Sequence, residues 1–144
     1  MKLDVARVDV WIASIEDHPG SLAKKLDTLA KAGVNLEFAI ARRAPEKLGT
    51  GVVFITPIRG AKQVKAACEA GFEKAESLYS LCITAANKPC VGARLAKQLG
   101  DAGINLRGFS GVAIGKRAAF YLAFDLAADA NQAMRLIKQI SATL

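Results

Sequence analysis

Near the start of the chain, the spacing of apolar residues changes from that of a strand to that of a helix. Residues 8–15 are apolar and rich in β-branched side chains, with Trp11 among them, which predicts a buried strand. The turn-forming residues 17–20 follow. Apolar residues then recur with the spacing of an amphipathic helix at Leu22, Leu26, Leu29 and Ala30. This segment is predicted to form a strand, a turn and a helix.

The pattern continues to residue 77. Gly33 stands where the chain leaves the helix, because glycine adopts the left-handed conformation at a helix end without a steric cost. The elements predicted after it are strands at 34–43 and 52–58, joined by a turn at 44–49, then a helix at 60–71 and a short strand at 72–77. The order of elements is therefore βαββαβ.

The sequence repeats itself at a constant offset of 70 residues. The stretches AGVNL and AGINL, which begin at Ala32 and Ala102, show the repeat most clearly. The identical pairs are Pro19 and Pro89, Ala23 and Ala93, Leu29 and Leu99, Ala32 and Ala102, Gly33 and Gly103, Asn35 and Asn105, and Leu36 and Leu106. We therefore expect two modules, residues 1–77 and 78–144.

The second copy lacks its last strand. Its predicted strands are 78–85, 104–114 and 117–126, and its predicted helices are 93–102 and 130–140. Only four residues remain after the second helix. Subtracting 70 from the last strand of the first copy gives residues 1–7, which alternate as a strand does. We expect this segment to complete the second module, in cis or from a partner chain, because an unpaired sheet edge is an aggregation hazard.

Composition narrows the classes of protein. The chain has 144 residues, 52% hydrophobic content and no apolar run long enough to span a bilayer, so a soluble, cytoplasmic protein without a membrane partner is expected. Three cysteines and one histidine lack metal-ligand spacing, and no cofactor motif is present, so neither metal nor cofactor is expected. No catalytic constellation is apparent, which argues against an enzyme.

The net charge of +7 raises the possibility of a nucleic-acid partner. The basic residues are scattered and form no tract, however, which is typical of solvated helix faces. An RNA-binding sheet needs aromatic residues for base stacking. The stretch RAAFYLAF from Arg117 offers Tyr121 and Phe124, a partial match, so nucleic-acid binding is the weaker hypothesis.

The turn between the first strand and first helix offers groups for a small zwitterion. Pro19 and Gly20 shape the turn, and the N–H groups of the helix start can accept a carboxylate. Asp17 can pair with an ammonium group. A free α-amino acid carries both a carboxylate and an ammonium group, and this turn can meet both. The alternative is that Asp17 or Ser21 only caps the helix.

Four other residues have roles that the sequence leaves open. Asn35 and Asn105 follow the helix-ending glycines, where an amide can offer a donor and an acceptor to a ligand or simply satisfy the backbone. His18 has no partner visible in the sequence. Cys90 lies at the mouth of the second loop.

With these residues in view, the chain resembles the ACT domain family, regulatory modules attached to or acting on enzymes of amino-acid metabolism. The stretch IEDHPGSLAKKLDTLAKAGVNLEFAIA from Ile15 carries the resemblance, with a fainter echo from Ile83 to Gly111. The resemblance implies an α+β fold of two tandem ferredoxin-like βαββαβ modules, with antiparallel sheets and helices on one face. It also implies that modules pair side by side and bind ligands at the interface between paired modules.

The resemblance assigns ligand-binding residues by position. In the first copy these are Asp17, His18, Pro19, Gly20, Ser21, Leu22 and Asn35, with Asn35 on the second strand. The corresponding residues of the second copy are Asn87, Lys88, Pro89, Cys90, Val91, Gly92 and Asn105. Asn87, Cys90 and Gly92 depart from the family pattern, so the second copy is either structural or binds a different ligand.

Three functions remain open at this stage. The first is a non-catalytic regulatory module that binds an amino acid and acts on an enzyme or regulator partner, as a homodimer. The second is a structural or assembly module without a ligand. The third is an RNA-binding domain. Ligand binding separates the first from the other two.

Overall fold

The computed structural model describes residues 2–143, with side chains described through Ser141. The chain divides into two compact units. The first module comprises Asp9–Ala75, and the second comprises the segment up to Val8 together with the residues from Glu76 onward. Within the described residues, no helix is both long enough and apolar enough to cross a bilayer.

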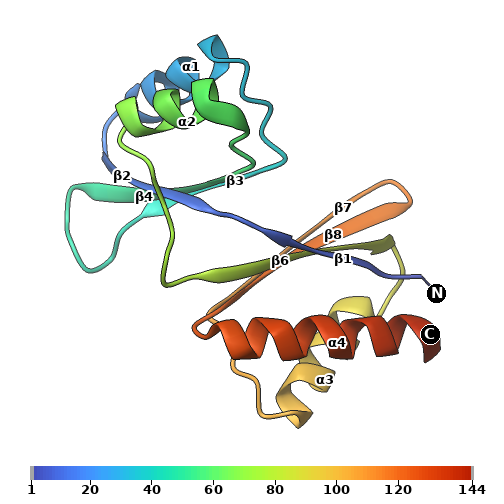
Figure 1. Cartoon of the computed structure of the whole chain (residues 1–144). Helices are drawn as coiled ribbons and strands as arrows, with labels where there is room; N and C mark the ends of the chain where they lie inside the picture. Colours follow the sequence, from blue (N-terminus) through green and yellow to red (C-terminus); the bar gives the residue numbers. More distant parts are fainter. Residues whose placement is uncertain (1, 144) are drawn as a thin grey trace. The chain divides into compact units, whose positions relative to one another are not determined.

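The first module is a four-stranded antiparallel sheet with two helices on one face (Figure 1). Its elements are β2 (Trp11–Glu16), α1 (Ser21–Lys31), β3 (Phe38–Arg43), β4 (Thr50–Thr56), α2 (Gly60–Glu69) and β5 (Glu73–Lys74). The strand order is β3-β4-β2-β5. Alternate residues of β2 and β4, among them Trp11, Val53 and Ile55, face the helices and form the core with Leu29 of α1 and Phe72.

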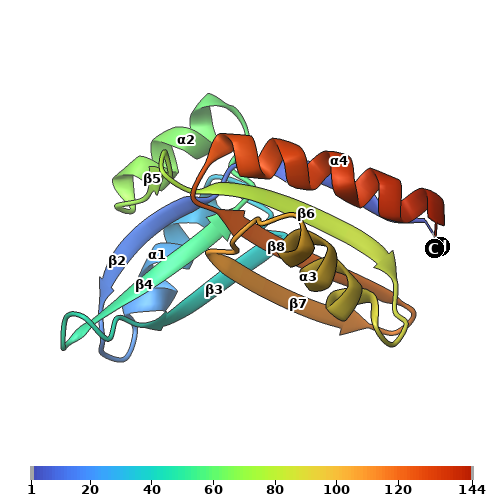
Figure 2. The ribbon, with the colours of Figure 1, turned by 90° about the horizontal axis from the view of Figure 1, so that it is seen from below.

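The second module has the same architecture (Figure 2). Its elements are β1 (Asp4–Val8), β6 (Tyr79–Ala86), α3 (Val91–Asp101), β7 (Gly108–Ile114), β8 (Arg117–Phe124) and α4 (Ala127–Thr143). The strand order β1-β6-β8-β7 matches that of the first module once β1 is taken as the last strand. Each module is thus an α+β unit of the ferredoxin-like βαββαβ type, in tandem.

The N-terminal segment lies in the sheet of the second module. Strand β1 pairs antiparallel with β6, with Asp4 opposite Thr84 and Val8 opposite Ser80. Leu3, just before the strand, is buried in the core of this module. Its N–H donates to the Ser141 hydroxyl of α4 at 2.8 Å, which fixes the start of β1 on that helix.

Several element boundaries differ from the sequence-based prediction. The strand predicted from residue 34 begins at Phe38, and the strand predicted from residue 104 begins at Gly108. The physical reason lies at the helix ends. The Val34 N–H donates back to the Leu29 carbonyl, and the Ile104 N–H donates back to Leu99, so these residues close the helices before the strands start.

Candidate functional site

The loop that enters α1 is held by its backbone. Gly20 has a φ of 90° and precedes the helix, and the Asp17 N–H donates to the Gly49 carbonyl in the turn between β3 and β4 at 3.0 Å. No side chain caps the helix, so the alternative of a capping role for Asp17 or Ser21 is wrong. The Ser21 N–H donates to the His18 carbonyl at 3.4 Å, so the N–H groups of Leu22 and Ala23 are those left available at the start of α1.

The Asp17 side chain already has an ion-pair partner. Arg43 Nε donates to Asp17 Oδ2 at 2.8 Å, and both side chains are accessible to solvent. An exposed ion pair of this kind is weak and can exchange partners. Asp17 therefore starts from a guanidinium partner, which an incoming ammonium group would have to replace.

His18, for which the sequence showed no partner, joins a small polar network. Its Nε2 lies 2.7 Å from Glu16 Oε2, and its Nδ1 lies 3.1 Å from the Pro19 carbonyl and 3.0 Å from the Ser21 hydroxyl. The bond to the Pro19 carbonyl, followed by the bond to Glu16, raises the pKa of His18 above its usual value of 6.5. An imidazole with a proton on each ring nitrogen can donate to both the Pro19 carbonyl and the Glu16 carboxylate.

A pocket of about 500 Å³ opens beside this loop. Its lining comes from β2, the loop, α1 and the end of α2, and includes residues 14–16, His18, Gly20, Ser21, Lys24, Lys25, Thr28, Glu69 and Ala70. Three of the residues predicted from the sequence line it, namely His18, Gly20 and Ser21. Volumes of this size are typical of small-molecule sites.

The pocket exists because the edge of β2 is only partly covered. Strand β5 is two residues long and pairs with Trp11 and Ile12. The Val10 carbonyl accepts from the Ala75 N–H on this side, so by alternation the N–H and C=O of Ser14 point to the same side. Beyond Ile12, no strand of the described residues pairs with β2 on this side, which leaves the Ser14 backbone facing the pocket.

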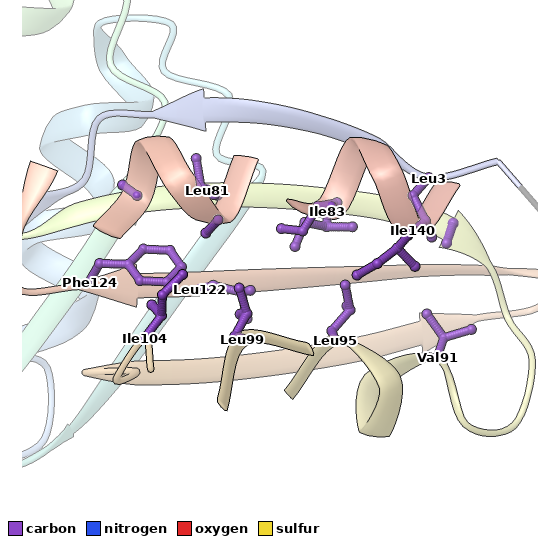
Figure 3. Close-up of a cluster of buried hydrophobic side chains, with 14 residues drawn as sticks. Leu3, Leu81, Ile83, Val91, Leu95, Leu99, Ile104, Leu122, Phe124 and Ile140 are labelled. Atoms are coloured by element: carbon purple, nitrogen blue, oxygen red, sulfur yellow. The ribbon is translucent and has the colours of Figure 1, made fainter. Parts of the chain in front are cut away.

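In the second module the equivalent space is filled. Thr84, which corresponds to Ser14, is paired with Asp4 of β1, and Leu3 and Ile140 are buried in the same core (Figure 3). The helix positions that carry Ser21 and Lys25 in the first module carry Val91 and Leu95 in the second. Val91 and Leu95 are buried core residues. The two copies have therefore diverged at these positions, which are polar and line a pocket in the first module and are apolar and buried in the second.

The remaining residues of the second loop have structural contacts. The Asn87 side chain donates to the Gly115 carbonyl at 3.2 Å, and its backbone N–H donates to the Lys116 carbonyl. Lys88 and Pro89 are exposed. Cys90 has a φ of 73° and takes the place of Gly20 before the helix.

Gly92 has a packing role. A Cβ at this position would lie 3.2 Å from Phe120 of β8, while the first module has Leu22 and Val53 at the equivalent places. The loss of the side chain at Gly92 therefore makes room for a larger one at Phe120. Val91 and Gly92 therefore pack against the core of the module.

Asn35 lies away from the loop within its own module. It is exposed in the segment before β3, so the expected position on a strand is wrong, and Asn105 has the same place before β7. Helix α1, with 11 residues, separates the loop from Asn35 by about 16 Å. One amino acid cannot span this distance. Asn35 contributes to a site at the loop only if it comes from a paired module.

Several pocket residues were missed by the sequence reasoning, among them Ser14, Lys24, Lys25 and Glu69. The signal was present in the repeat. At the positions of Ser21 and Lys25 the second copy has apolar residues at helix-core spacing, which marks a face that is solvated in one copy and buried in the other.

The structure also bears on the alternative partners. Phe124 is fully buried on the helix side of its sheet, while Tyr121, three residues earlier, lies on the opposite face. The two aromatic residues therefore cannot form one stacking platform, and the partial RNA-binding match is wrong on this point. The described residues contain no cluster of three or more potential metal ligands.

Comparisons with known proteins point to a fold. No family model matches the sequence. No curated protein matches it either. The regulatory subunit of aspartate kinase from Thermus thermophilus, in its ligand-free form, matches with a TM-score of 0.67 at 17% identity, over 96% of each chain. The chain has the fold of this regulatory subunit. That result agrees with the fold that the ACT resemblance implies.

Other solved structures share the same fold. Protein BT0572 from Bacteroides thetaiotaomicron matches with a TM-score of 0.78 at 16% identity, over 94% of this chain and 90% of that one. Aspartokinase III from E. coli, in complex with aspartate and ADP, matches with a TM-score of 0.58 at 12% identity. This match covers 99% of the present chain but 33% of the kinase, so the chain corresponds to one part of that enzyme.

Proposed function

We propose that the chain is a non-catalytic regulatory module that binds a free amino acid and acts on a partner enzyme or regulator. The observation that carries the proposal is the open pocket at the loop of the first module, where the start of α1 and the edge of β2 both present unpaired backbone groups. Such groups complement the carboxylate and ammonium of an amino acid.

The structural neighbours support a regulatory role. The regulatory subunit of aspartate kinase from Thermus thermophilus matches this chain over 96% of each chain. Aspartokinase III from E. coli was solved with lysine and aspartate bound. A chain of this fold that lacks a catalytic constellation acts by changing the state of a partner, and the ligand does so by favouring one arrangement.

Pairing between copies is part of the proposal. Strand β7 is an edge strand of its sheet (Figure 2) and exposes apolar side chains, with Val112 56% and Ile114 80% accessible. An exposed edge strand with apolar side chains can pair with a strand of another chain. We propose a homodimer, in which Asn35 of a paired module can reach the loop of its partner. We also propose a cytoplasmic location, supported by three cysteines that form no disulfide in the described residues, which fits a reducing compartment.

A thermal-shift screen against the twenty amino acids tests the function. A ligand that binds the native state raises the free energy of unfolding by mass action, by about 2.7 kcal/mol at a concentration one hundred times its Kd. The unfolding midpoint rises as a result. We expect one chemical group of amino acids to raise the midpoint, and Asp17→Ala tests whether the Asp17 carboxylate takes part in binding. Asn35→Ala tests whether a paired module contributes. The absence of any shift would leave an assembly role without a ligand.

A further inference from the structure

The charged side chains around the pocket differ in how they are paired. Lys24 and Lys25 lie on the wall that α1 provides, and neither takes part in an ion pair among the described residues. Lys25 Nζ donates to the Ala70 carbonyl at 2.5 Å, which is a neutral acceptor. Ala70 is the C-cap of α2, and Lys25 Nζ also lies 5.8 Å from the centre of the Phe72 ring, so the charge of Lys25 is partly compensated. Lys24 therefore presents the less compensated positive charge to the pocket, together with the positive end of the α1 dipole.

The two carboxylates of the pocket, Glu16 and Glu69, equal the two lysines in number, but each already has an ion-pair partner. Glu16 is paired with His18 at 2.7 Å. Glu69 lies 4.0 Å from Lys65 Nζ, at the limit of an ion pair, and is exposed. The Ser14 carbonyl adds a neutral acceptor on the open edge of β2. The Glu69 carboxylate, held only by a long and exposed ion pair, and the Ser14 carbonyl are therefore the acceptors that can meet a single ammonium group.

We propose that this pocket binds an acidic α-amino acid, with one molecule per chain and none in the second module. The two carboxylates of the ligand meet Lys24, Lys25 and the first N–H groups of α1, and its ammonium meets Glu69 and the Ser14 carbonyl. The inference rests on the proposed function and adds to it the class of ligand and a site within one module.

The second module explains why one site per chain is expected. Val91 and Leu95 replace Ser21 and Lys25, and both are at most 3% exposed. The edge that corresponds to Ser14 is covered by β1. No charged ligand can enter this apolar core without losing its hydration.

Isothermal titration of the full chain tests the proposal, with aspartate and glutamate compared with asparagine, glutamine and inorganic phosphate. We expect one of the two acidic amino acids to bind with one site per chain. The matching amide should bind at least about tenfold more weakly, because a charge-assisted hydrogen bond contributes about 1.5–3 kcal/mol and 1.4 kcal/mol is tenfold in affinity.

Variants localise the site. Lys24→Gln should weaken binding of the acid about tenfold. Arg94→Gln is the matched control, because Arg94 occupies the same position on α3 in the second module, and it should leave the affinity unchanged. The unfolding midpoint of each variant without ligand shows that the fold is intact.

Six results would overturn the inference. If the amides bind as well as the acids, or only neutral amino acids bind, the ligand class is wrong while the proposed function stands. If Arg94→Gln weakens binding as much as Lys24→Gln, or the stoichiometry is half a ligand per chain, the site is elsewhere. Binding of phosphate alone would indicate a simple anion site. If no amino acid binds, the proposed function fails as well.

Discussion

At the residue scale, the two loops differ most at the position before the helix. Gly20 and Cys90 both have positive φ, of 90° and 73°. Glycine accepts this conformation, whereas a side chain with a Cβ is strained there. No heavy atom lies within 4 Å of a Cβ built on Gly20, so the backbone conformation alone sets the cost of a substitution.

Substitutions at these two positions should change the free energy of unfolding in opposite directions. Cys90→Gly should raise the free energy of unfolding by roughly 0.5–1 kcal/mol, and Gly20→Ala should lower it by about 1 kcal/mol. Urea denaturation followed by circular dichroism measures both. A loss of stability in Cys90→Gly would mean that the thiol makes a contact worth more than the strain.

His18 should titrate above its usual range. The Pro19 carbonyl and the Glu16 carboxylate both favour the imidazolium, and since the folded pKa is raised, the network stabilises the native state fully below about pH 6.5. This contribution is lost as the pH rises through the folded pKa. His18 is the only histidine, so its NMR titration is unambiguous.

The control for this titration is Glu16→Gln. It should lower the pKa of His18 only in part, because the Pro19 carbonyl, which has the larger effect, remains. An equal or lower pKa in the folded protein than in urea would show that the network does not form in solution.

At the scale of elements, the last strand decides whether a module is open or closed. In the second module β1 has five residues and its neighbour α4 has 17. In the first module β5 has two residues and α2 has ten. The longer pair covers the end of the core, whereas the shorter pair leaves the pocket.

Leu3 should therefore contribute to stability as a core residue does. It is 5% exposed, and Leu3→Ala should lower the free energy of unfolding by about 2–4 kcal/mol, because it removes buried apolar surface and leaves a cavity. Lys2→Ala, beside it and exposed, should change stability by less than about 0.5 kcal/mol. Urea denaturation compares the two. An unaffected Leu3→Ala would mean that β1 is not docked in solution.

At the scale of the whole molecule, the repeat made much of the fold predictable. The shared Gly33 and Gly103 mark the helix ends, and the 70-residue offset points to residues 1–7 as the strand beside β6. These features follow from local backbone chemistry and from periodicity, which a sequence displays directly.

The pocket was harder to foresee. It depends on where β5 and α2 stop, and it brings together Ser14, Lys25 and Ala70, which are distant in the sequence. Helix and strand ends are set by small differences in backbone hydrogen bonding that composition does not reveal. For the same reason the sequence placed Asn35 on a strand, while the structure has it in the segment before β3.

The central claim is that an amino acid binds at the first module and not at the second. Amide NMR spectra, recorded as the best-binding amino acid is added, test it directly. We predict shifts at Ser14, Ser21, Lys24 and Lys25, with the amides of residues 87–92 unchanged. Shifts concentrated at residues 87–92, or none at either loop, would contradict the account.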